Sequence, residues 1–187
     1  DPYDISRRAL RVNLSDVAAM GASPKHYLLS LGINDNVNDF WIDRFSKGLA
    51  FDQKKYNLTL IGGDTVNTKG PIVIAVTLIG EIDPKKAIGR NEAKPMHNIY
   101  VSGSIGDAFF GLKLLNKEIL LSKVYTDQLI DRYKLPDPRL DLGQKLINLA
   151  SSSLDISDGL VADLEHICTS SKVGATIHGV PILGSVE

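Results

Sequence analysis

Segments with helical spacing of apolar residues alternate along this chain with short apolar runs of strand length, and this alternation limits the possible folds most. The spacing predicts helices over residues 5–21, 38–56, 123–133 and 140–150, and two more that begin near 107 and near 157. Strands are expected over 26–32, 58–62, 72–82, 98–102, 152–156 and 173–179. A turn at residues 69–71 further predicts that 58–66 and 72–81 pair as a hairpin. This order is typical of an α/β or α+β fold, not of a helix bundle or a β-sandwich.

Size and composition narrow the class of protein. The chain has 187 residues, enough for one large domain or two small α/β units. Its net charge is −1, from 21 basic and 22 acidic residues, and no basic run suggests a nucleic-acid partner. No stretch reaches the roughly 18 apolar residues of a membrane span, and the first residues show no signal-peptide pattern. We therefore expect a soluble, cytoplasmic protein without membrane or nucleic-acid partners.

Residues 154–160 carry two carboxylates and a hydroxyl at the predicted junction of a strand and a helix. Ser157 would cap the helix there, and the open backbone amides of a helix start favour an anion or a phosphate. Asp155 and Asp158 need the opposite partner, a cation. A site that takes both is typical of magnesium–nucleotide binding. An ordinary strand-to-helix turn explains the same residues equally well, and both interpretations stay open at this point.

Two further aspartates stand in special settings. Asp64 follows a glycine pair at a predicted strand end, where the backbone can turn tightly and bring the carboxylate to the sheet edge. A glycine bulge with a turn-forming aspartate is the structural alternative. Asp16 lies on the polar face of the first predicted helix. If Asp16 and Asp64 converge with the pair near 157, their carboxylates repel one another. Each repulsion between two carboxylates roughly 4 Å apart costs about 4 kcal/mol at an effective dielectric near 20. A divalent cation such as Mg²⁺ offsets this cost.

Other motifs exclude several classes of site. The glycine-rich turn over residues 103–107 matches neither a Walker A loop nor the full dinucleotide fingerprint. The four histidines and Cys168 lack the spacing of a structural zinc site, and no G-x-S-x-G elbow is present. The single cysteine also excludes an internal disulfide.

Three motifs together resemble a known family. They are Asn-Leu-Ser-Asp-Val-Ala-Ala-Met-Gly-Ala at 13–22, Ile-Gly-Gly-Asp-Thr at 61–65, and Asp-Ile-Ser-Asp-Gly-Leu at 155–160. In this order and spacing they resemble the thiamine-monophosphate kinases, which belong to the aminoimidazole ribonucleotide synthetase-like ATP-binding superfamily. The family usually has Ser-Gly where this chain has Asn91-Glu92, and Gly-Asp where it has Met96-His97.

The resemblance implies a reaction and a set of residues. The reaction is transfer of the γ-phosphate of ATP to thiamine monophosphate, giving thiamine diphosphate, with Mg²⁺ as the metal. The resemblance assigns the metal to Asp16, Asp64, Asp155 and Asp158. It assigns contacts with ATP to Gly63, Asp64, Arg90 and Ser157.

The resemblance also implies an architecture of two modules with mixed sheets covered by helices. Residues 1–84 would form the N-terminal-like ATP and metal module, which pairs across a homodimer axis into a shared β-barrel. Residues 85–187 would form the C-terminal-like module, with helices on a sheet and the nucleotide in the cleft between modules. Segments that the family has before and after these residues are absent from the sequence, so we expect the 187 residues alone to be inactive.

Two other functions remain alternatives. One is a related ATP-dependent synthetase of the same superfamily that acts on an amide or a ribotide. The other is a non-catalytic nucleotide-binding module, which would bind ATP without phosphoryl transfer. The choice of substrate separates these functions, and the fold does not.

Overall fold

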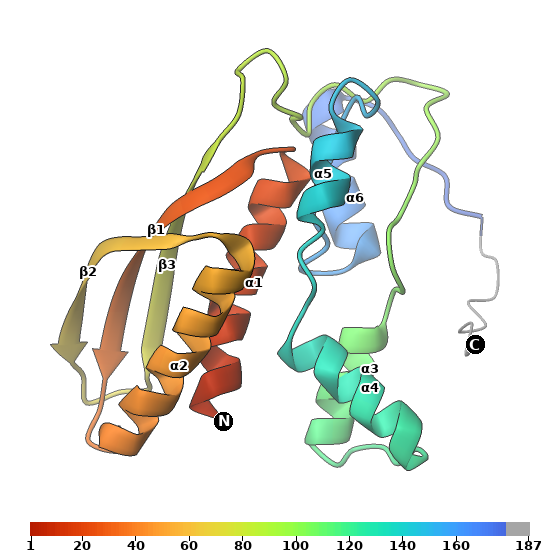
Figure 1. The fold of residues 1–187 in the computed structure, drawn as a ribbon. Coiled ribbons are helices and arrows are strands. Elements are labelled where there is room, and N and C mark those ends of the chain that lie inside the picture. Colours follow the sequence, from red (N-terminus) through yellow and green to blue (C-terminus); the bar gives the residue numbers. More distant parts are fainter. Residues whose placement is uncertain (179–187) are drawn as a thin grey trace.

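A computed structural model of the chain describes residues 1–178, and residues 179–187 lie outside that description. The elements are α1 (Pro2–Ala19), β1 (Ser23–Ile33), α2 (Asp39–Tyr56), β2 (Thr59–Asn67), β3 (Val73–Glu81), α3 (Asp107–Leu115), α4 (Lys123–Lys134), α5 (Leu140–Leu146) and α6 (Leu160–Ser171). The three strands form a mixed sheet with helices packed beside it, which confirms the predicted α/β class (Figure 1). None of the helices described over residues 1–178 combines the length and apolar character that crossing a bilayer requires.

The strand order is β2-β1-β3, with β1 parallel to β2 and antiparallel to β3. The predicted hairpin between 58–66 and 72–81 is therefore wrong, because β1 lies between those two strands. Gly63 explains part of this arrangement. A Cβ atom at that position would clash with the carbonyl oxygen of Leu29, so β2 comes this close to β1 only with a glycine there. Every second residue along most of β3 is exposed.

Helices α1 and α2 cover one face of the sheet and enclose the main core (Figure 1). The buried apolar residues of this core are Leu10, Leu14, Tyr27, Leu29, Phe45, Leu49 and Leu58. Trp41 extends the core on α2, with its ring stacked on Phe45 at a centroid separation of 4.8 Å. The i, i+4 spacing of Trp41, Phe45 and Leu49 gives α2 one apolar stripe that faces the sheet.

Helix α1 lies between the sheet and α2 on one side and α5 on the other (Figure 1). α5 packs so closely on α1 that a Cβ atom at Gly143 would clash with the carbonyl oxygen of Ala18. Beyond the end of α1, the amide of Ile88 donates to the carbonyl oxygen of Met20 at 3.1 Å. α1 therefore contacts the later part of the chain, and β1 adds a further contact, because Nε2 of Gln144 donates to the hydroxyl of Ser23 at 2.8 Å.

The strands predicted over 98–102 and 152–156 are absent, and residues 173–178 also have no regular secondary structure. Residue 179, the last of that third prediction, lies outside the described residues. A strand needs a neighbour that satisfies its backbone groups, and within residues 1–178 no segment pairs with these three. Together with α6 they line a hollow of about 1140 Å³. The sheet expected for residues 85–187 is thus not present in the part of them that the structure describes.

Candidate metal and nucleotide site

Asp16 and Asp155 come together from opposite ends of the chain. Asp16 is in the last turn of α1, and Asp155 is half-buried in the segment that leads to α6. Partial desolvation raises the pKa of the Asp16 carboxyl group, and repulsion by Asp155 and a hydrogen bond with it act in the same direction. The positive charge of Arg90 acts in the opposite direction and lowers that pKa. The two carboxyl groups therefore lie in contact, and the guanidinium group of Arg90 is near enough for its charge to act on Asp16.

The loop that carries Arg90 is fastened to residues near Asp155. The amide of Ser153 donates to the carbonyl oxygen of Gly89 at 3.1 Å. On the other side, the hydroxyl of Ser171, at the end of α6, donates to the carbonyl oxygen of Arg90 at 3.0 Å. The Arg90 side chain is exposed, so its charge is available to a ligand near the two carboxyl groups.

The turn before α6 differs from the predicted one. The helix begins at Leu160 with Gly159 as its N-cap, so Ser157 is not the cap. Gly159 has φ 125° and ψ 153°, a conformation essentially limited to glycine, and it prevents the helix from starting two residues earlier. The amides of Ser157, Asp158 and Gly159 donate to Oδ2 of Asp163 at 2.9, 3.1 and 3.1 Å. The amides predicted to be open for a phosphate are thus bound to a carboxylate of the chain itself.

Asp64 lies elsewhere. β2 continues through Asn67, so Asp64 is inside the strand instead of at its end. It pairs with Ser30 of β1 on the face of the sheet that α1 and α2 leave uncovered, beside a hollow of about 480 Å³. Asp158 is exposed. Within residues 1–178 no three side chains of histidine, cysteine or acidic type group closely enough to hold a metal ion. The structure therefore pairs two of the four predicted metal ligands, and it does not bring Asp64 or Asp158 into a cluster with them.

The pair of Asp16 and Asp155 nevertheless fits a hard divalent cation. Mg²⁺ takes oxygen ligands, and proteins usually hold it with one or two carboxylates while waters and substrate phosphates complete its shell. A cation between these groups would relieve the repulsion by Asp155, which adds to desolvation in raising the pKa of Asp16. Arg90 adds a positive charge of the kind that binds phosphate oxygens.

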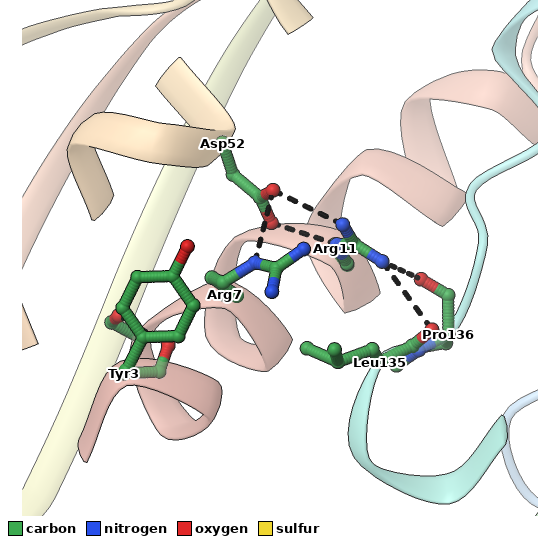
Figure 2. A network of polar contacts seen from close by, with 7 residues as sticks. Tyr3, Arg7, Arg11, Asp52, Leu135 and Pro136 are labelled. Carbon is green, nitrogen blue, oxygen red and sulfur yellow. Dashed lines mark hydrogen bonds and ion pairs between the residues drawn. The ribbon is translucent and has the colours of Figure 1, made fainter. Parts of the chain in front are cut away.

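A buried ionic network that the sequence analysis missed joins α1 to the later helices (Figure 2). Asp52 of α2 is fully buried and accepts from Arg11 Nε at 2.7 Å, Arg11 Nη2 at 3.1 Å and Arg7 Nε at 3.3 Å. Nη1 of Arg11 also donates to the carbonyl oxygens of Leu135 and Pro136, both at 3.4 Å. Burial acts to lower the pKa of Arg11, but the hydrogen bonds and charge of Asp52 outweigh it, and that pKa is raised.

Comparison with known proteins finds similarities that agree with one another. Residues 1–82 match the family described as AIR synthase related protein, N-terminal domain. Over 99% of its length the chain is 42% identical to thiamine-monophosphate kinase of Haemophilus influenzae, and it covers 56% of that protein. The corresponding enzyme of Escherichia coli K12 is 42% identical over 95% of the chain, which covers 54% of it.

A solved structure agrees. The structure of AaThiL in complex with AMPPCP and TMP superposes with a TM-score of 0.85 at 34% identity, over 91% of this chain and 54% of that one. The chain thus spans about half the length of the relatives it matches. Its first 82 residues are therefore similar to AIR synthase related N-terminal domains, and the chain as a whole is similar to about half of the thiamine-monophosphate kinases.

Proposed function

We propose that the full-length protein carrying these residues transfers the γ-phosphoryl group of ATP to thiamine monophosphate, with Mg²⁺ as cofactor, and forms thiamine diphosphate. The names of its relatives support this reaction, and so does the AaThiL complex, whose ligands are AMPPCP and TMP. AMPPCP is an ATP analogue in which a methylene group replaces the β,γ-bridging oxygen. The observation that carries the proposal is the meeting of Asp16, Asp155 and Arg90 from three distant segments.

Phosphoryl transfer depends mainly on positioning and on stabilising charge, so few residues need to react themselves. Asp16 and Asp155 would hold the metal, and Mg²⁺ when bound neutralises charge on the phosphate oxygens. Arg90 would bind phosphate oxygens of the nucleotide from the loop beside them.

The remaining predicted site residues are also part of the proposal. Asp64 and Asp158 are proposed as further metal ligands, and Gly63 and Ser157 as further contacts with ATP. Their support is the match of the motifs at 61–65 and 155–160. For Ser157 the contact would come from its side chain, because its amide is bound to Asp163.

We further propose two modules, 1–84 and 85–187, and a homodimer. The family match ends at residue 82, just before a polar turn at residues 83–86, which supports the boundary. The uncovered face of the sheet supports a second copy as partner, because Leu28, Val66 and Val73 are exposed there and their burial would be favourable. The use of ATP supports a location in the cytoplasm.

The test is product formation by the full-length protein with ATP, Mg²⁺ and thiamine monophosphate, followed by chromatography of thiamine diphosphate. Asp155→Asn should lower the rate by about 100-fold or more, as expected when charge stabilisation at the reacting centre is lost. Asp35→Asn is the matched control. It removes an exposed charge from the loop between β1 and α2 and should leave the rate unchanged. Bound ATP without any thiamine diphosphate from the wild type would refute the reaction and favour a synthetase or a non-catalytic module.

A further inference from the structure

Asp163 is a buried acidic residue in the first turn of α6 that the proposed reaction does not use. Only 5% of its surface is exposed, whereas Glu165, two residues later on the same helix, is exposed. Burial of a carboxylate is costly unless hydrogen bonds satisfy its oxygens. Here three backbone amides supply those bonds, all to the single oxygen Oδ2.

The three amides are successive along the chain, from Ser157 to Gly159. Successive amides that converge on one point form a concave anion site, and phosphate is a common occupant of such sites. In this protein the occupant is the side chain of Asp163. Hydrogen bonds from amides to an ionised carboxylate are roughly twice as strong as neutral ones, so the bond set defines the shape of the turn.

The turn has no other obvious constraint. A Cβ atom added at Gly159 would meet nothing within 4 Å, so packing does not force the unusual backbone conformation there. The flanking positions Ser157 and Asp158 are exposed. The carboxylate of Asp163 is therefore the main contact that ties this turn to the rest of the molecule.

We propose that Asp163 is a positioning residue for the divalent-cation site: it holds the backbone of residues 157–159, so that Asp155 and Asp158 present their carboxylates in fixed directions. It also keeps the amides closed to phosphate, so that phosphate is bound through the metal and Arg90. This inference rests on the proposed function, because it takes Asp155 as a ligand of Mg²⁺. Loss of residues that orient metal ligands typically lowers metal affinity by about 10- to 100-fold.

The experiment compares Asp163→Ala and Asp163→Asn with the control Glu165→Gln in the full-length protein. Mn²⁺ serves as the probe, with free Mn²⁺ followed by electron paramagnetic resonance and Mg²⁺ as competitor. Both Asp163 variants should raise the Kd for Mn²⁺ about tenfold or more, since asparagine directs no negative charge at the amides. Glu165→Gln removes an equal charge nearby and should leave the Kd within about twofold, which separates positioning from general electrostatics.

Amide hydrogen exchange provides a readout that does not depend on the metal. Peptides covering residues 157–159 should exchange slowly in the wild type and fast in Asp163→Ala. Added sodium formate, with sodium chloride at equal ionic strength as control, should restore slow exchange and Mn²⁺ affinity together, because formate can enter the vacated anion site.

Either an unchanged Kd for Mn²⁺ in both Asp163 variants or fast exchange in the wild type would overturn the inference. If the wild type binds no Mn²⁺ while its amides are protected, the metal assignment of the proposed function is wrong, and the positioning role is wrong with it. That pattern differs from an unchanged Kd, so the two failures are distinguishable. If Asp163→Ala does not fold, Asp163→Asn, which keeps the side-chain volume, decides.

Discussion

Substitution of Asp52 by alanine should strongly destabilise the protein, because it leaves two buried guanidinium groups without their carboxylate. The side chains of Arg11 and Arg7 are only 6% and 12% exposed, and Asp52 is fully buried. Removal of one partner from a buried ion pair typically costs about 3–5 kcal/mol. Arg11 would keep the carbonyl oxygens of Leu135 and Pro136 as acceptors. We therefore expect the lower end of that range, about 3 kcal/mol of unfolding free energy.

The assay is urea unfolding followed by fluorescence of Trp41, the only tryptophan of the chain, which stacks on Phe45 in the core. A loss of 3 kcal/mol corresponds to a fall in Tm of about 6–12 °C for a chain of this size. The matched control is Asp43→Asn on the same helix. Asp43 pairs with Lys47 at 2.8 Å, but its side chain is 52% exposed. An exposed pair of this kind contributes about 0.5 kcal/mol or less.

A double substitution tests the reasoning further. Arg11→Met with Asp52→Leu replaces the shorter of the two ion pairs of Asp52 by apolar groups of similar volume, which is often neutral for stability. The double variant should therefore be more stable than Asp52→Ala alone, although it removes more polar contacts. The account is refuted if Asp52→Ala and Asp43→Asn differ by less than about 1 kcal/mol.

Three further predictions follow from single positions. Met96 is exposed and has φ 70°, a left-handed conformation that costs a methionine free energy. Met96→Gly should therefore raise the unfolding free energy by about 1 kcal/mol in urea titrations, and the absence of a gain would contradict this. Gly143→Ala should lower the unfolding free energy by about 1–3 kcal/mol, because the new methyl group meets the carbonyl oxygen of Ala18. Gly174→Ala is the control and should show no loss from a clash, because the space around Gly174 is open. Arg90→Ala should weaken binding of AMPPCP by about 1.5–3 kcal/mol in calorimetry, the usual range for a charged hydrogen bond, and an unchanged affinity would remove Arg90 from the site.

Local patterns in the sequence predicted the first half of the fold well. Helical spacing located α1 and α2, and runs of apolar and β-branched residues located β1, β2 and β3. The pairing of the strands was not predictable from the turn at 69–71, because adjacency in sequence favoured a hairpin. The close approach of Gly63 to Leu29, which accompanies this order, is a contact between residues far apart in the chain.

In the second half, helical spacing located α3, α4, α5 and α6, but the strand patterns failed for a physical reason. The segments 98–102 and 152–156 have the composition of strands, but a strand forms only where another segment satisfies its backbone, and residues 1–178 supply none. The composition of these segments therefore indicated that they favour strands, but it did not predict the conformation that the structure shows.

The candidate site was predictable in its residue types and only partly in its arrangement. The motifs identified Asp16 and Asp155, and the family resemblance added Arg90. The structure brings the two carboxyl groups together and places Arg90 near enough for its charge to act on Asp16. Asp163 was missed, although an aspartate between Leu160 and Leu164 on the apolar face of the predicted helix was a usable signal. Its role depends on the backbone conformation of Gly159, which no spacing rule gives.

The network around Asp52 was missed for a similar reason. Arg7 and Arg11 are one helical turn apart, and Arg11 directly follows the core residue Leu10. A basic residue beside an apolar stripe suggests a buried partner. The partner, however, is Asp52 on another helix, 41 residues away, and sequence alone does not identify it.

The most direct test of the central claim is the affinity for AMPPCP with and without Mg²⁺, measured by calorimetry on the full-length wild type and on Asp155→Asn. If Asp16 and Asp155 hold the metal that binds the phosphates, Mg²⁺ should strengthen AMPPCP binding by about tenfold or more in the wild type, and this gain should be lost in the variant. An equal gain from Mg²⁺ in both proteins would show that the metal binds elsewhere and would contradict the assignment.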